Sequence, residues 1–195
     1  MNTIAAFDFD GTLTRKDTLF DFLIFSFGKK KVIAGLTLLF PGLLAYKAGF
    51  VSNDIAKQRL FSFFFRDMKA EKFEILCKKY AYRISEILKK DAITKMREHQ
   101  KAGHKIVIVS ASVENWISPW AKNESVELVL GTQIETIDNR LTGRFESKNC
   151  YGQEKVNRFL SEFPDRNTYS LYAYGDSRGD KELLSIADFA FFKRF

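Results

Sequence analysis

The sequence predicts an α/β fold, with a three-layer αβα core built on a parallel sheet and an all-helical cap inserted into it. Two observations predict the core: short apolar runs alternate with helical patterns, and several runs end abruptly in small or acidic residues. A third observation predicts the insertion. The first two strands end about 100 residues apart, whereas a crossover with one helix needs only about a dozen or more.

Four apolar runs indicate strands. The first is IAAFDFDGTLT at 4–14, and the others are KIVIVSAS at 105–112, YSLYAYGDSRGD at 169–180 and DFAFF at 188–192. Helical patterns lie between them at 91–102, 113–123, 152–163 and 178–187. Segment 126–145 predicts one more core strand and a hairpin that turns at Asp138-Asn139. This alternation places helices on both faces of a parallel sheet.

The inserted segment, residues 17–90, contains almost only helical signals. We therefore assign 17–90 to the cap and residues 1–16 and 91–195 to the core. Cap helices are expected at 17–27, in two short pieces around Pro41-Gly42, at 52–66 after a Ser52 or Asn53 cap, and at 69–89. We expect this cap to lie over the strand ends.

The cap contains one long apolar stretch, VIAGLTLLFPGLLAYKAGFV at 32–51, whose only charge is Lys47 and which follows three lysines. It could pack within the cap or a dimer interface, lie in a membrane surface, or span a bilayer. A span would put Asp8 and Ser110 on opposite sides of the bilayer, and Pro41-Gly42 should split the stretch into two helices. Packing is therefore the favoured interpretation.

Composition excludes several classes of protein. With 46% apolar and 28% charged residues the chain is not disordered, and Cys77 and Cys150 suggest neither a disulfide framework nor a zinc site. The N-terminus has no signal-peptide pattern, so we expect a cytoplasmic protein, with membrane association as the alternative. The net charge of +7 suits phosphorylated molecules or anionic lipid; the lysine clusters lack the aromatic and arginine residues typical of nucleic-acid surfaces, so no nucleic-acid partner is expected.

The first strand delivers two acids, Asp8 and Asp10, to the sheet edge. Gly11 permits the turn that follows them, and Thr12 can hydrogen-bond within it. Two close carboxylates repel each other unless a cation lies between them, and such oxygen ligands suit Mg²⁺. An acidic turn that merely caps a helix is the alternative.

Other strand and helix ends add further polar groups. Asp176, with Asp180 one helical turn later, ends another strand, and Ser110 brings a hydroxyl before a helix N-terminus that can hold an oxyanion. Lys155 falls in the first turn of a helix, where a cation opposes the helix dipole. Alone it would be read as a solvated side chain; together these groups predict a site at the carboxyl ends of the strands.

The motifs DFDGT, IVSAS, GQEK and GDSRGD, in that order, resemble the four motifs of the haloacid dehalogenase (HAD) superfamily. DFDGTLTRKDT is similar to the phosphoserine-phosphatase-like branch, subfamily IB, whose cap is inserted after the first motif. The resemblance covers the core nearly end to end. It implies a Rossmann-like core and an Mg²⁺-dependent phosphatase, a phosphoric monoester hydrolase acting on a small phosphorylated substrate.

The resemblance also implies roles for the residues in these motifs. Asp8 would be the nucleophile that forms an aspartyl phosphate, and Asp10 the general acid and base. Magnesium would be bound by Asp8, the backbone carbonyl of Asp10 and Asp176. Asp180 would stabilise the water shell of the ion or the residues next to it. The expected phosphate-binding residues are Ser110, Ala111, Lys155, Gly11 and Thr12.

Substrate choice should depend on the cap. In phosphoserine phosphatases an acid soon after the first motif binds the substrate amine, which Asp17 could do here, and a cap arginine binds the carboxylate, for which Arg59 or Arg66 is available. The fourth motif lacks the asparagine usual before its last acid, so phosphoserine is in doubt. The alternative substrate is a lipid phosphate of the phosphatidylglycerophosphate type. The protein would then contact the membrane surface through residues 32–51.

Two other classes of protein remain open. A signalling receiver domain also groups acids, a hydroxyl and a lysine around Mg²⁺. In that domain, however, the phosphorylated aspartate ends a later strand, and there is no long helical insertion. A non-catalytic scaffold or membrane-surface protein could keep the fold without turnover. His99 and His104, around a helix-to-strand turn, are expected to be surface residues and not ligands.

Overall fold

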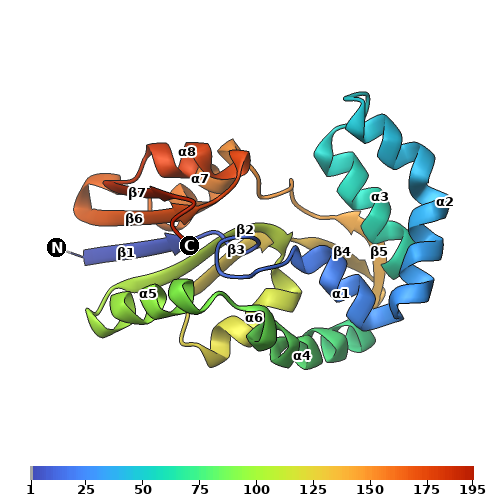
Figure 1. Ribbon diagram of the computed structural model, residues 1–195, viewed down its shortest axis with the longest axis horizontal. Coiled ribbons are helices and arrows are strands. Elements are labelled where there is room, and N and C mark those ends of the chain that lie inside the picture. The colour runs from blue at the N-terminus through green and yellow to red at the C-terminus, as the bar shows by residue number, and fades with distance from the viewer. Residues whose placement is uncertain (1) are drawn as a thin grey trace.

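The central sheet has five parallel strands in the order β3-β2-β1-β6-β7 (Figure 1). A computed structural model describes residues 2–195. The strands of this sheet are β1 (Asn2–Phe7), β2 (Lys105–Val113), β3 (Leu128–Thr132), β6 (Tyr169–Gly175) and β7 (Phe189–Phe192). All four apolar runs thus form strands, and the predicted α/β class with a parallel sheet is confirmed.

The first strand, β1, lies at the centre of this sheet. Ile4 pairs with Lys105 of β2, and Asn2 pairs with Tyr169 of β6. Its residues 4–7 are buried because helices cover both faces, which explains why the run is apolar without alternation. Asp8 follows the last residue of β1 and therefore lies at the edge formed by the carboxyl ends of the strands.

Helices form the two outer layers of the core. On one side lie α5 (Lys90–Lys101) and α6 (Glu114–Asn123), and on the other α7 (Gln153–Glu162) and α8 (Lys181–Ser185). Alternate residues of β1 enter separate clusters: Ala5 and Phe7 pack in one, Ile4 and Ala6 in the other. The helix expected at 178–187 is shorter than predicted, since a 3₁₀ turn, η2 (Arg178–Asp180), precedes α8. A second 3₁₀ turn, η1 (Arg166–Thr168), leads into β6.

Four helices occupy the inserted segment: α1 (Thr18–Phe27), α2 (Lys29–Lys47), α3 (Asn53–Phe65) and α4 (Ala70–Ile87). Asp17 caps α1 by accepting the backbone N–H groups of Leu19 and Phe20, and Ser52 caps α3. α2 and α3 form a projecting pair, whereas α4 packs along α6 of the core. The division at 17–90 stays a prediction.

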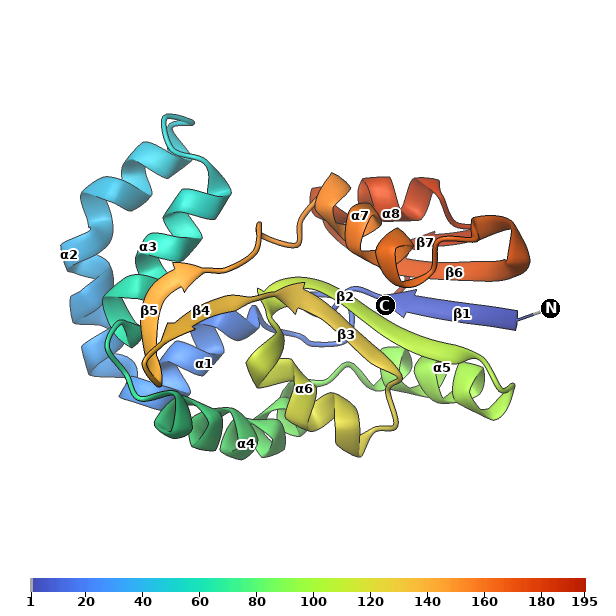
Figure 2. The ribbon, with the colours of Figure 1, turned by 180° about the vertical axis from the view of Figure 1, so that it is seen from behind.

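The predicted hairpin is present as β4 (Ile134–Ile137) and β5 (Arg140–Phe145). It turns at Asp138 and Asn139, both in the left-handed region, with φ of 47° and 59°. The hairpin leaves the sheet edge and packs against α3, as Figure 2 shows. The cap helices therefore gain part of their support from a segment that follows β3.

The predicted division of the stretch 32–51 into two helices at Pro41-Gly42 is wrong, because α2 runs through Pro41 without interruption. Proline lacks the N–H that would donate to the carbonyl of residue 37. Thr37 and Pro41 are both exposed, so water can hydrate that carbonyl. Among residues 2–195, no helix combines the length and apolar character needed to cross a bilayer.

The expectation that His99 is a surface residue is also wrong. His99 is buried, its Nε2 lies 2.9 Å from the hydroxyl of Tyr174, and its Nδ1 lies 2.7 Å from Nδ1 of His104. Burial lowers the pKa of His99 to about 4, and His104 and Lys95 act in the same direction. Cys77 and Cys150 are buried free thiols.

Candidate active site

A cavity of about 330 Å³ opens where the strands end and the cap helices begin. Its wall comes from both parts of the chain: the loops after β1 and β6, the last residues of β2, the start of α7, and residues of α1, α2 and α3. The charged and hydroxyl groups that line it include Asp8, Asp10, Asp17, Lys57, Ser110, Lys155, Asp176 and Ser177. The sequence motifs therefore converge on one cavity.

Lys155 is the most completely buried cation of the site, with 2% of its surface exposed. Its Nζ lies 2.6 Å from Oδ1 of Asp8, 2.6 Å from Oδ1 of Asp180 and 2.7 Å from the carbonyl oxygen of Val109. Burial alone would lower the pKa of Lys155, but the two carboxylates hold it above its ordinary value. These contacts account for a lysine in the first turn of α7 despite the helix dipole.

Asp8 faces the cavity with one oxygen engaged and one open. Lys155 binds Oδ1, whereas no donor among the described residues reaches Oδ2. Burial raises the pKa of Asp8 to about 7, the ammonium of Lys155 opposes this rise, and Asp180 and Asp10 add to it. The open oxygen is thus a basic, fixed atom at the floor of the cavity.

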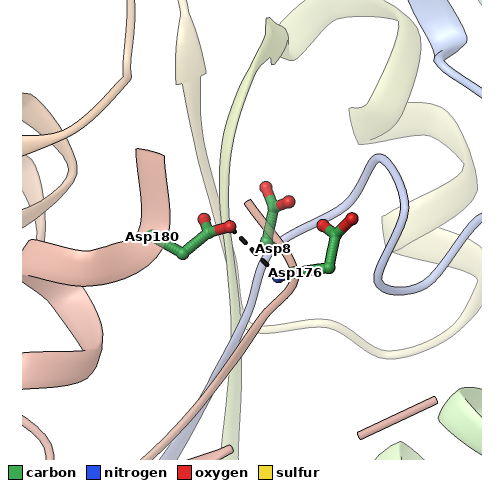
Figure 3. A group of neighbouring side chains, drawn as sticks. All are labelled: Asp8, Asp176 and Asp180. Atoms are coloured by element: carbon green, nitrogen blue, oxygen red, sulfur yellow. Dashed lines mark hydrogen bonds between the residues drawn. The ribbon is translucent and has the colours of Figure 1, made fainter. Parts of the chain in front are cut away.

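Three carboxylates could hold a divalent cation. Oxygen atoms of Asp8, Asp176 and Asp180 lie within 4.8 Å of one another (Figure 3). Asp180 has its oxygens engaged by protein donors: Oδ1 by Lys155, and Oδ2 by the backbone N–H groups of Asp176 and Ser177 and the Ser177 hydroxyl. Asp8 and Asp176 each keep an oxygen without a protein donor, so these two fit the role of direct ligands.

Gly11 and Thr12 determine the position of the Asp176 carboxylate. Gly11 has φ of +79°, and a Cβ atom there would lie 2.3 Å from Oδ2 of Asp176, so only glycine lets the first loop approach this carboxylate. The hydroxyl of Thr12 donates to Oδ1 of Asp176 at 3.2 Å. This hydrogen bond connects Thr12 to the acidic cluster.

Asp10 points toward the cap side of the cavity and not into the three-carboxylate group. Its Oδ1 accepts the backbone N–H of Thr18 at 2.8 Å, and its Oδ2 accepts the hydroxyl of Ser112 at 2.5 Å. Burial raises the pKa of Asp10, Asp17 adds to the rise, and the hydrogen bonds from Ser112 and Thr18 oppose it. A buried carboxyl with a raised pKa suits proton transfer.

The last residues of β2 line another wall of the cavity. Ser110 is buried, and its oxygen accepts the backbone N–H of Ser112 at 3.1 Å. The carbonyl of Ala111 accepts two donors, the hydroxyl of Thr132 at 2.8 Å and Nζ of Lys57 at 2.7 Å. These bonds fix the end of the strand from the core side and from the cap side.

Lys57 of α3 is a cavity residue that the sequence analysis missed. It reaches across to the Ala111 carbonyl, and burial lowers its pKa although Asp10, Asp17 and Asp8 oppose this. A signal for it exists in the sequence: Lys57, Phe61 and Phe65 recur every four residues, and both phenylalanines are buried. The helix periodicity therefore places Lys57 on the inward face.

The cap arginines lie elsewhere. Arg59 lines a separate small pocket between α2 and α3 with Leu39, Gly42 and Leu43, and Arg66 is exposed beside Asp67. Asp17 does line the main cavity while it caps α1. The structure thus brings Asp17 to the acids of the core and leaves both arginines outside the cavity.

Comparisons with known proteins agree with this geometry. The family model of haloacid dehalogenase-like hydrolases matches residues 5–185. Protein CicA of Caulobacter vibrioides is 33% identical over 192 residues, which covers 95% of this chain and 83% of CicA.

Two solved structures show the same fold. A protein of unknown function from Bordetella pertussis Tohama I has a TM-score of 0.78 at 21% identity, covering 95% of this chain and 87% of that one. A substrate-bound phosphoserine phosphatase has a TM-score of 0.66 at 17% identity, covering 96% and 83%. The fold of the phosphoserine-phosphatase-like branch is thereby confirmed, and the chain belongs to the family of haloacid dehalogenase-like hydrolases.

Proposed function

We propose that this protein is a magnesium-dependent phosphatase that hydrolyses a phosphomonoester through an aspartyl phosphate on Asp8. One observation carries the proposal: Asp8 presents a free Oδ2 to the cavity while Lys155 holds its other oxygen. Carboxylates of this kind act as nucleophiles by dividing one difficult displacement into two easier ones. The fold shared with a phosphoserine phosphatase supports the assignment.

In the first step Oδ2 of Asp8 attacks phosphorus and the bond to the leaving alkoxide breaks. Asp10 gives its proton to that alkoxide, for which its raised pKa prepares it. In the second step Asp10 takes a proton from water, which attacks the phosphorus and releases phosphate and the free carboxylate of Asp8. Ser110 and Lys155 bind phosphoryl oxygens, and we assign the same role to Gly11, Thr12 and the backbone of Ala111.

The acidic cluster fits Mg²⁺ because Asp8 and Asp176 offer oxygens that no protein donor engages. These two residues would hold the ion together with the backbone carbonyl of Asp10, and Asp180 keeps Lys155 and the Asp176 loop in place. When bound, the ion supplies positive charge that offsets the charge of the phosphoryl group.

The cavity wall constrains the substrate. Leu19, Phe20, Leu43 and Leu60 form an apolar side, and Lys57 offers a cation beside it. This combination suits a small phosphorylated molecule that carries a second anionic group near apolar atoms. A lipid phosphate is a second candidate, because Leu43 and Tyr46 of the exposed helix α2 line the cavity.

Phosphate release from p-nitrophenyl phosphate tests the proposal. We expect turnover by the wild type with Mg²⁺, loss of turnover in EDTA, and a fall of roughly a thousandfold or more in Asp8→Asn, since the nucleophile is gone. Asp165→Asn, an exposed acid outside the cavity, is the matched control. Equal release by wild type and Asp8→Asn would contradict the mechanism and leave a non-catalytic scaffold as the better assignment.

A panel of phosphorylated metabolites and lipid phosphates then identifies the substrate class. Preference for water-soluble esters with a second anionic group would support the first candidate. Preference for phosphate esters of lipids presented in mixed micelles would support the second.

A further inference from the structure

The outer face of α2 exposes an unusual amount of apolar surface. Leu38 is 72% exposed and Phe40 60%, and Ile33 and Leu44 are also more than half exposed. Phe50, in the turn that follows, is 86% exposed. Ile33, Phe40 and Leu44 follow one another at intervals of seven and four residues and so share one face of α2, and exposed apolar faces of this kind mark interaction sites.

The inner face of α2 already satisfies the packing that the fold requires. Val32 and Gly35 are buried, and Leu36 and Leu39 pack against the main hydrophobic cluster. A Cβ atom at Gly35 would lie 2.5 Å from the ring of Phe64, so α2 and α3 are in close contact. The outer apolar residues are therefore not needed to attach this helix to the protein.

The charges around this face have one sign. Residues 22–53 contain four lysines, Lys29, Lys30, Lys31 and Lys47, and no aspartate or glutamate. Within residues 2–195 none of the four lies within ion-pair distance of a carboxylate. Three of them open α2, where cations oppose the helix dipole. The apolar face is thus bordered at both ends by unpaired cations.

We propose that α2 docks the protein on an anionic lipid surface, with its axis along the membrane plane. The apolar side chains Ile33, Phe40 and Leu44 would enter the boundary between headgroups and acyl chains, and the lysines would meet anionic headgroups. Lysine suits this place because its long stem can cover apolar surface while the ammonium stays among the headgroups. The docking does not depend on the proposed catalytic function.

The charge pattern favours lipid over the other occupants of an apolar face. A two-fold dimer pairs a patch with itself, so neither copy would bring an acid from 22–53 to offset the lysines of the other. The helix also lies at the outer edge of the molecule (Figures 1 and 2). A flat fluid surface with negative charge matches both features.

Flotation with vesicles tests the proposal on the full chain. We expect wild type to float with vesicles of phosphatidylcholine and phosphatidylglycerol, and not with phosphatidylcholine alone. Phe40→Ser combined with Leu44→Ser should lower the partition coefficient about tenfold or more. Changing Lys29, Lys30 and Lys31 to Gln should lower it roughly a hundredfold, and added salt should weaken binding by the wild type.

Matched variants on α4 separate this effect from a general loss of apolar or basic surface. Ile75→Ser with Tyr82→Ser, and Lys72, Lys78 and Lys79 changed to Gln, alter exposed residues of the same types and should leave flotation unchanged. Release of phosphate from p-nitrophenyl phosphate should be the same in all these variants, which shows that they fold.

Three results would overturn the proposal. The first is no flotation of wild type with anionic vesicles, and the second is equal flotation with both vesicle types. The third is a dimer in sedimentation equilibrium that Phe40→Ser with Leu44→Ser dissociates, without vesicle binding, since this would assign the face to a second copy.

Discussion

The ammonium of Lys155 lies 2.6 Å from Oδ1 of Asp8, although the two residues belong to different motifs 147 positions apart. The same ammonium binds Asp180 at an equal distance. One cation thus fixes the orientation of the proposed nucleophile and offsets two buried carboxylates.

Replacing Lys155 should cost stability as well as activity. Lys155→Met leaves Asp8 and Asp180 buried without their counter-charge, and loss of one partner of a buried ion pair costs about 3–5 kcal/mol. Urea denaturation should therefore show a free energy of unfolding lower by about this amount. Lys148→Met, at an exposed lysine, should unfold like wild type. A loss below about 1 kcal/mol would show that the carboxylates do not need Lys155.

Lys57 should contribute to substrate recognition, and its neighbour Arg59 should not. Lys57→Met removes the cation at the cavity wall, so kcat/KM should fall about tenfold or more for phosphate esters that also carry a carboxylate. For p-nitrophenyl phosphate, which lacks that group, it should change little. Arg59→Met serves as the control because Arg59 lines a different pocket. Equal losses on both kinds of ester would argue against a role in recognising a second anion.

Ser112 should tune the proton transfer assigned to Asp10. Its hydroxyl donates to Asp10 Oδ2 and favours the charged carboxylate, so Ser112→Ala should raise the pKa of Asp10 further. As the general acid must be protonated, the alkaline limb of the kcat profile should move to higher pH. Ser118→Ala, at an exposed serine, should leave the profile in place. Movement to lower pH would contradict the assignment.

His99 should make stability depend on pH in the mildly acidic range. Its folded-state pKa is lowered to about 4 from 6.5, so below pH 6.5 the unfolded chain binds a proton that the folded protein does not. The free energy of unfolding should therefore fall as pH decreases from about 6.5 to about 4, by an amount on the order of 2–3 kcal/mol.

The variant His99→Gln isolates this contribution. Its difference in free energy of unfolding from the wild type, measured by urea denaturation, should shift in favour of the variant as pH falls through this range. Parallel pH curves for the two proteins would show that the buried imidazole titrates normally.

Much of the core follows from local sequence. Apolar runs that end at Asp8, Ser110 and Asp176 indicate parallel strands and the edge where they end, and the motifs supply the residues that meet there. The end of α1 at Gly28 and the start of α3 after Ser52 follow from capping. These features depend on residues that are close in sequence, so they can be predicted from the sequence pattern.

Other features depend on tertiary packing. The continuity of α2 through Pro41 depends on an exposed carbonyl that water can satisfy, and the position of the hairpin depends on α3 being there to receive it. Lys57 and His99 were missed for a different reason. Each lies on the inward face of its helix, His99 in line with Ala92 and Met96, although lysine and histidine are residue types more often found at the surface.

The central position of β1 also bears on how the chain acquires its fold. Its two neighbours in the sheet begin at Lys105 and Tyr169, so β1 has no partner strand until those distant segments have been synthesised. Contacts of such long range slow folding and expose apolar strands in the meantime. Synthesis of this protein should therefore pass through a stage in which its central strand is unpaired, and Asp8, the proposed nucleophile, gains its environment only after β6 has formed.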